Sequence, residues 1–161
     1  MNVLIFVVII LVVIFSFVIL FGAPYLPTLS KTAEDAFELL SLKPGQTLLE
    51  LGSGDGKMLK LAAHRGIKSI GYELNPLLVL YTKLTCLKYR RLIKVYCRNY
   101  WQVSLPKCDG IYVFLLDRFM PKLDQKIAAE LKPPIKLVSH AFKIPGKKIA
   151  AEKNALFLYK Y

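Results

Sequence analysis

The sequence is poor in side chains that bind transition metals. It has two histidines, His64 and His140, which lie far apart, and three cysteines, Cys86, Cys97 and Cys108, without a C-x-x-C pair. Zinc sites usually bring such ligands together at short spacings. We therefore expect no metal site. We expect the cysteines to be small buried apolar residues, which a cytoplasmic location keeps reduced.

Charge is absent from the first part of the chain. From Val3 to Ala23 there is no Asp, Glu, Lys or Arg, and the only polar side chain is Ser16. Twenty helical residues rise about 30 Å, the thickness of the hydrocarbon core of a bilayer. The chain start lacks the basic side chain of a cleaved signal peptide, and the apolar run is too long for one. Residues 1–23 are therefore predicted to form a transmembrane anchor.

All charged side chains follow this segment, so the rest of the chain carries the whole net charge of +12. Basic residues after the apolar run predict a single-pass membrane protein whose catalytic domain is cytoplasmic. A basic domain tethered there is attracted to an anionic lipid surface. Nucleic acid is the other usual partner of such a charge, but the anchor makes lipid the simpler interpretation. A solvated basic face is the alternative that needs no partner.

Strand and helix patterns alternate beyond a short linker, residues 24–31. A helix is predicted to open at a capping box formed by Thr32 and Asp35. Strand-like runs then cover residues 47–51, 67–74, 92–97, 108–116, 135–144 and 154–161, and helix-like runs cover residues 57–66, 76–91 and 120–132. Alternation of this kind predicts an α/β domain over residues 32–161, with a parallel sheet covered on both faces.

The stretch LLELGSGDGK places three glycines directly after a strand-like run. A P-loop would need a glycine at the position of Leu51 and Ser or Thr at the position of Met58. A dinucleotide-binding loop would need a glycine at the position of Lys57. Both of these phosphate-binding loops are therefore excluded.

The remaining pattern is Glu50-x-Gly52-x-Gly54-x-Gly56, the loop of S-adenosylmethionine (SAM) enzymes. The cofactor's amino acid end and ribose lie directly on such a loop, where a Cβ would clash and glycine permits the approach. Glu50 can accept a hydrogen bond from the cofactor's ammonium, directly or through water. The sequence therefore predicts SAM as the cofactor.

Acidic and aromatic side chains at the next strand ends extend this site. Glu73, about 20 residues on, can bind both ribose hydroxyls, although a helix N-terminal carboxylate is the alternative. Asn99 can bind the adenine edge or simply form a turn, and Tyr100 or Trp101 can stack on the base. Neighbouring loop residues complete the predicted cofactor set: Ser53, Asp55 and Leu74.

The segments GAPYLPT, LLELGSGDGK, GYELNP, FLLDRFMPKLDQKIAAELK and LVSHAFKI together resemble one family. It is that of the seven-strand, Rossmann-like class I protein lysine methyltransferases. Its members include an archaeal broad-specificity type and mitochondrial membrane-anchored enzymes for adenine nucleotide translocase and for the c-ring protein of the ATP synthase. The resemblance implies SAM-dependent N-methylation of an exposed lysine in a protein, with membrane proteins as the expected substrates of the anchored type.

The resemblance also implies that the PYLPT segment, with Tyr25 and Thr28, closes over the cofactor. Two departures stand out. Asn99 replaces an Asp that the mitochondrial members tend to carry, and the soluble archaeal type has no anchor. Anchoring therefore resembles the mitochondrial way of reaching a membrane substrate.

The acceptor lysine must be neutral to attack, which a dry site rimmed by Tyr25, Tyr72 and the FLLD turn would favour. Asp117 is predicted either to orient the acceptor or to cap the following helix. His140 is predicted either to be a core histidine or to line a substrate channel.

Other functions remain open at this point. The LLDRF segment lacks the Asn/Asp-Pro-Pro-aromatic motif of enzymes that methylate exocyclic amines of bases, so nucleic acid is not the expected substrate. Methylation of a lipid or quinone headgroup suits a membrane enzyme equally well. A membrane-bound module that binds SAM or lipid without turnover is the third hypothesis.

Overall fold

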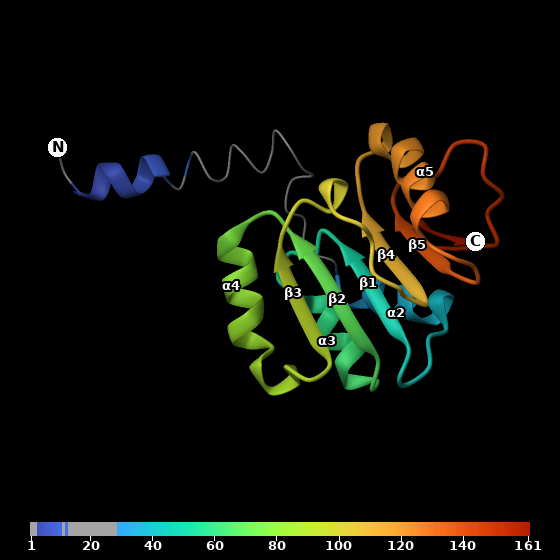
Figure 1. The fold of residues 1–161 in the computed structure, drawn as a ribbon, viewed down its shortest axis with the longest axis horizontal. Coiled ribbons are helices and arrows are strands. Elements are labelled where there is room, and N and C mark those ends of the chain that lie inside the picture. The colour runs from blue at the N-terminus through green and yellow to red at the C-terminus, as the bar shows by residue number, and fades with distance from the viewer. Residues whose placement is uncertain (1–2, 11, 13–28) are drawn as a thin grey trace.

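The structure, a computed structural model, describes residues 3–10, 12 and 29–161 (Figure 1). Its helices are α2 (Ser30–Leu40), α3 (Lys57–His64), α4 (Pro76–Thr85) and α5 (Met120–Glu130). Its strands are β1 (Thr47–Leu51), β2 (Lys68–Glu73), β3 (Ile93–Cys97), β4 (Gly110–Phe114), β5 (Lys136–His140), β6 (Ala151–Lys153) and β7 (Leu156–Lys160). Short 3-10 turns are η1 (Leu87–Tyr89), η2 (Tyr100–Gln102) and η3 (Asp117–Phe119).

The strands form one seven-stranded sheet in the order β3-β2-β1-β4-β5-β7-β6. The first five strands of the chain pair in parallel, as the alternating pattern predicts. The last two differ, because β7 is antiparallel to β5 and to β6. Asn154 and Ala155 join β6 to β7 with φ values of 48° and 60°. Positive φ at both turn residues suits a tight hairpin.

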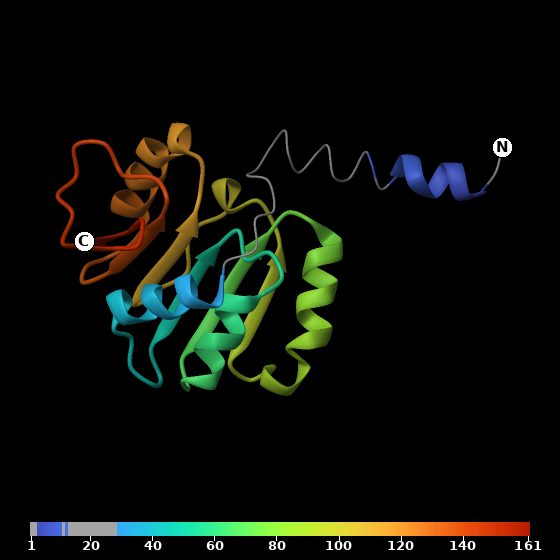
Figure 2. The ribbon, with the colours of Figure 1, turned by 180° about the vertical axis from the view of Figure 1, so that it is seen from behind.

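Helices cover both faces of this sheet. α2 and α3 lie on one face and α5 on the other, as the front and back views show (Figures 1 and 2). Leu48 and Tyr112 belong to the core cluster on the α2 side, whereas Leu49 and Val113 belong to the cluster on the α5 side. Successive strand residues point to opposite faces, so these central strands are apolar at almost every position.

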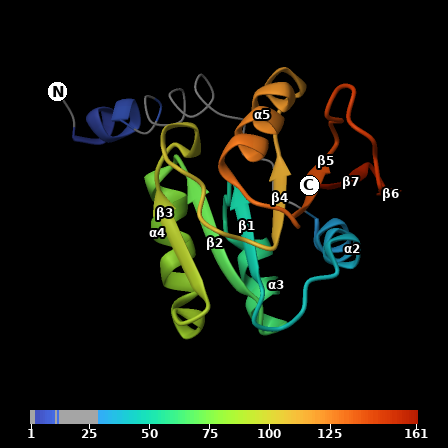
Figure 3. The same ribbon diagram turned by 45° about the vertical axis from the view of Figure 1, so that its right-hand side comes forward.

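α4 lies beside β3, where one edge of the sheet is formed (Figure 3). Its predicted run of residues 76–91 is too long, since the α-helix ends at Thr85 and a separate turn, η1, follows. Cys86 between them is buried, as predicted, but Cys97 at the end of β3 is exposed. The apolar pattern continues through Cys86, so periodicity alone does not reveal the break.

The predicted capping box at the start of α2 is wrong. The helix begins at Ser30 after Leu29, and no side chain caps it. Asp35 is buried and instead pairs with Lys153, with 2.8 Å between Nζ and Oδ1, and accepts a hydrogen bond from Asn154. Asp35 therefore ties α2 to the β6–β7 hairpin, a partner that lies far away in the sequence.

The predicted single-pass membrane topology must be corrected. Among the described residues, no helix combines the length and the apolar character needed to cross a bilayer. Residues 3–10 are helical, and eight such residues rise only about 12 Å, against roughly 30 Å of hydrocarbon. The cytoplasmic placement rested on that topology and falls with it. The rest of the predicted anchor and Tyr25 and Thr28 of the linker lie outside the described residues.

Candidate active site

The predicted cofactor residues gather at one edge of the sheet. β1, β2, β3 and β4 are parallel, with Leu51 opposite Tyr72 and Val113 in the register. Their carboxyl ends therefore meet, and the segments after them carry the glycine loop, Glu73, Asn99 and Asp117 in turn. The order of strands reverses between β1 and β4, which is where open α/β sheets bind ligands.

The glycine loop, residues 52–56, joins β1 to α3. Gly52, Gly54 and Gly56 all have positive φ, at 91°, 50° and 73°. The backbone N–H groups of Gly52 and Ser53 both donate to the Tyr72 carbonyl oxygen at 2.9 Å, which holds the loop on β2. A Cβ built on Gly52 would meet nothing within 4 Å, so that side of the loop is open for a ligand.

Gly56 is required for a different reason. A Cβ at this position would lie 2.4 Å from Cγ2 of Thr82 in α4. The hydroxyl of Thr82 donates to the Gly54 carbonyl oxygen at 3.1 Å, and its side chain is fully buried. Thr82 is not among the site residues predicted from the sequence. The signal available was a polar side chain within the apolar run VLYTKL.

Glu73 at the end of β2 is held by three backbone N–H groups. Its carboxylate accepts from Gly54 at 2.9 Å and from Leu74 and Asn75 at 2.8 Å each. Asn75, rather than Glu73, caps α4 by accepting from Leu77 and Leu78. A carboxylate offers about four lone-pair sites, so Glu73 retains acceptor capacity for hydroxyl donors while it orders the loop.

Glu50, the last-but-one residue of β1, is buried without a full set of partners. Its side chain is 4% exposed, and among the described residues nothing hydrogen-bonds its Oε2 atom. Burial, followed by the nearby charges of Asp55 and Glu73, raises the pKa of Glu50 well above its ordinary value. An unpaired buried carboxyl is costly, and a cationic ligand group beside it would relieve that cost. This residue fits the ammonium end of SAM.

The segment after β3 contains the predicted adenine-contacting residues. Asn99 caps η2, with its Oδ1 accepting from the Trp101 backbone N–H at 3.0 Å, so it does form a turn. Tyr100 is buried, and this burial raises its pKa. Trp101 is half-buried, with its ring 4.8 Å from that of Tyr100 and Lys122 Nζ 4.7 Å above it. Base stacking by these rings stays a prediction.

The predicted acceptor-site residues are placed unequally. Tyr72 is buried in the core, 5.8 Å from the Tyr96 ring, and burial raises its pKa. Asp117 is exposed at the start of η3, and no side chain caps either η3 or α5. The capping alternative for Asp117 is therefore wrong, while its role in orienting an acceptor stays a prediction.

His140 ends β5 beside the carboxyl end of β4. Its ring lies 4.4 Å from the Phe114 ring, and its Nδ1 is 3.4 Å from the Tyr112 hydroxyl oxygen. Burial lowers the pKa of His140, which favours the neutral imidazole. Its position combines both predicted alternatives, since it packs on the core and borders the carboxyl edge of the sheet.

A groove of about 450 Å³ lies beside the glycine loop. Residues of α2, α3 and α4 line it, including Lys60, His64 and Tyr81, together with Asp55 of the loop. Glu50 and Glu73 are not part of its lining. The groove is therefore separate from the predicted cofactor position, and we place the cofactor by the two glutamates.

A solved structure has the same fold. An RNA methyltransferase from Salinibacter ruber, in complex with S-adenosyl-L-homocysteine, matches with a TM-score of 0.76 at 21% identity, over 84% of this chain and 92% of that chain. This likeness defines the class: the seven-strand, Rossmann-like methyltransferase fold. The predicted fold of the domain is confirmed.

The family follows from the sequence comparison. The family described as the ANTKMT methyltransferase domain matches residues 50–151, so the chain belongs to this family. A Mus musculus lysine N-methyltransferase named for the ATP synthase c-ring protein is 31% identical over 124 residues, 76% of this chain and 50% of that protein. An adenine nucleotide translocase lysine N-methyltransferase from the same organism is 36% identical over 126 residues, 76% of this chain and 54% of that protein.

An archaeal relative matches as well. A protein-lysine N-methyltransferase from Saccharolobus islandicus is 28% identical over 130 residues, 76% of this chain and 79% of that protein. The resemblance to both the mitochondrial and the archaeal type is thus confirmed. The chain spans about half the length of the two mouse relatives.

Proposed function

We propose that this chain is a SAM-dependent methyltransferase that acts on lysine side chains of proteins. The single observation that carries the proposal is the pair of glutamates flanking an open glycine loop. Glu50 has an unpartnered buried oxygen, and Glu73 is held by three backbone N–H groups. The printed names of three relatives, which are lysine N-methyltransferases, support the choice of lysine as the acceptor.

The chain's residues divide the work of binding. Glu73 takes the ribose hydroxyls, Glu50 takes the ammonium, and Gly52 leaves room for the chain of the cofactor between them. Asn99, Tyr100 and Trp101 border the base. When bound, SAM supplies a methyl group on a positively charged sulfur to an attacking amine.

The acceptor amine must lose its proton before it can attack. Deprotonating a free lysine of pKa about 10.4 at pH 7 costs roughly 4 to 5 kcal/mol. Apolar surroundings favour the neutral amine, and the lowered pKa of His140 beside Phe114 indicates such surroundings at the carboxyl ends of β4 and β5. We propose that the lysine enters there, with Asp117 orienting it and Tyr25 and Tyr72 at its rim. Positioning then provides most of the catalysis.

The proposed substrate is a protein lysine beside an anionic lipid surface. The net charge of +12 supports this partner, because a basic domain is attracted to anionic headgroups. Methylation of a lipid or quinone headgroup and binding without turnover are the competing functions.

Tritiated SAM offered to membranes together with the protein separates the three functions. We expect label in protein bands, at lysine by mass spectrometry. Label in the organic phase would instead identify a lipid or quinone acceptor, and label in neither fraction would indicate a binding module. A Glu73→Ala variant run in parallel controls for methyltransferases already present in the membranes.

Replacing Glu50 with glutamine should stabilise the ligand-free protein and weaken SAM binding. The folded state raises the pKa of Glu50, so this carboxyl favours folding at low pH, where it is protonated. That contribution is lost as the pH rises above the ordinary glutamate value toward the raised one. The neutral amide avoids the loss. We expect a melting temperature roughly 3 °C higher at pH 7.5, and a smaller gain near pH 4.

Thermal unfolding at both pH values and calorimetric SAM titration test this expectation. Glu152, an exposed glutamate of β6, provides the matched control through Glu152→Gln. A Glu50→Gln protein that is no more stable at pH 7.5 than at pH 4, relative to the parent, would contradict the account of this carboxyl.

A further inference from the structure

The exposed apolar side chains of the domain gather on one helix. Within residues 30–161, six large hydrophobic side chains are exposed, and five of them lie on α4 and η1. These five, which we call the α4 stripe, are Leu77, Leu80, Tyr81, Leu84 and Leu87, with exposed fractions of 44% to 65%. Their spacing of three, one, three and three residues places them along one side of the helix.

α4 is apolar on both of its sides. Its buried residues, Val79 and Thr82, face the sheet and the glycine loop, and the α4 stripe faces outward. A surface helix of a globular protein normally presents polar side chains to water, and a helix that is apolar all round is normally covered. Contiguous exposed apolar surface of this kind marks an interaction site.

The charges around the stripe are all of one sign. Between Leu74 and Cys108 the sequence has no Asp or Glu and seven basic residues. They are Lys83, Lys88, Arg90, Arg91, Lys94, Arg98 and Lys107. In the part of the chain that the structure describes, none of the seven forms an ion pair with a carboxylate.

We propose that the α4 stripe is a docking surface for an anionic lipid membrane, with α4 lying in the plane of the interface. Leucines beside a basic rim suit acyl chains beneath anionic headgroups. Single-stranded nucleic acid would instead call for exposed aromatic side chains on which bases stack, and four of the five stripe residues are leucines. The proposal gives the lipid partner of the proposed enzyme a defined face.

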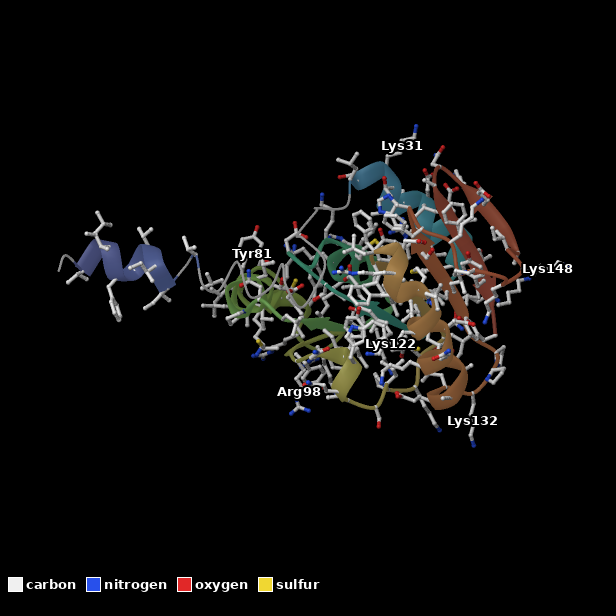
Figure 4. The ribbon with its side chains drawn as sticks, turned by 90° about the horizontal axis from the view of Figure 1, so that it is seen from above. Lys31, Tyr81, Arg98, Lys122, Lys132 and Lys148 are labelled. Atoms are coloured by element: carbon white, nitrogen blue, oxygen red, sulfur yellow. The ribbon has the colours of Figure 1, made fainter. Side chains whose placement is uncertain are left out.

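The stripe lies next to the active edge of the sheet. α4 begins at Pro76, immediately after Glu73 and Asn75, and Thr82 on its inner side contacts the glycine loop. Lys60 Nζ lies 5.4 Å from the Tyr81 ring centre, which adds a cation beside the stripe. Figure 4 shows Tyr81 on the opposite side of the domain from Lys132 and Lys148. Docking through α4 therefore leaves the α5 side facing away from the membrane.

A tryptophan in the stripe reports directly on insertion. The parent has one tryptophan, Trp101, so the full-length Leu84→Trp variant is compared with the parent in the same titration. Vesicles of phosphatidylcholine are used with and without phosphatidylserine, and a parallel set contains brominated acyl chains. With phosphatidylserine present, we expect the variant alone to show a blue shift and quenching by the brominated lipid.

Substitutions then separate the apolar and basic contributions. Leu80→Gln with Leu84→Gln should weaken binding to phosphatidylserine vesicles by about tenfold or more. Lys83→Gln with Lys88→Gln should weaken it roughly tenfold at low salt and much less at high salt, where charges are screened. The matched control, Lys132→Gln with Lys148→Gln, removes the same charge from the far side and should change affinity by less than about twofold. Circular dichroism checks that each variant is folded.

Three results would overturn the proposal. One is a Leu84→Trp spectrum that vesicles do not change, and another is equal vesicle affinity for parent and leucine double variant. The third is self-association without lipid that the leucine variant abolishes, since a second copy would then cover the stripe. Vesicle binding involves no methyl transfer, so these outcomes are distinct from a failure of the proposed activity.

Discussion

Replacing Glu73 with alanine should weaken SAM binding by roughly ten- to a hundredfold, because hydrogen bonds to a charged acceptor contribute about 1.5 to 3 kcal/mol. The substitution also removes the acceptor that holds the Gly54 N–H at 2.9 Å, so the glycine loop loses a contact across 19 residues of chain. Isothermal titration calorimetry with SAM measures the change directly.

Glu73→Gln refines the same measurement. The amide keeps the shape and one acceptor oxygen but loses the negative charge, so we expect an affinity between those of the parent and Glu73→Ala. Exposed Glu152 in β6 supplies the control, since Glu152→Ala should leave SAM affinity unchanged. A folded Glu73→Ala protein with the parent's affinity would remove Glu73 from the site.

Alanine at Gly56 should lower the free energy of unfolding by about 2 to 4 kcal/mol. Positive φ costs a non-glycine residue about 1 to 2 kcal/mol, and overpacking typically adds 1 to 3 kcal/mol. The new Cβ would lie 2.4 Å from the Thr82 methyl carbon, which belongs to a short branched side chain with little room to move. Adding Thr82→Ala should recover part of the loss. Urea unfolding of the single and double variants tests both statements.

Gly52→Ala provides the contrast. Its Cβ meets nothing within 4 Å, so only the φ cost of about 1 to 2 kcal/mol applies to stability. SAM binding, however, should fall below detection, because the Cβ would occupy the path of the cofactor. Normal SAM affinity in Gly52→Ala would show that the cofactor does not cross this glycine, and a Gly56→Ala protein as stable as the parent would refute the packing argument.

Local signals in the sequence are enough to predict the glycine loop, Glu50, Glu73 and the five parallel strands. Each depends on spacing within a strand-loop-helix unit, where the backbone requirement and the residue type coincide. The residue type at Gly52 or Gly56 states the conformation, although not which of the two leaves space and which one packs.

Contacts between distant segments could not be predicted in this way. Thr82 meets Gly54 across 28 residues, and Asp35 meets Asn154 across 119. In sequence, Asp35 fits a helix cap equally well, and only the sheet order brings the β6–β7 hairpin to it. The sequence does not indicate that hairpin either, because Ala155 adopts a positive φ that its residue type does not signal.

The two borders of the sheet differ in how they discourage other strands from joining. β6 has three residues, too few to offer a long row of free backbone groups, and it includes Glu152 and Lys153. β3 is longer but carries an exposed Lys94 near its middle, with Arg98 just beyond its end. A second sheet that added to β3 would have to bury or repel these cations. The β-structure is thereby guarded against edge-to-edge aggregation, and contact through the leucines of α4 stays a side-chain event.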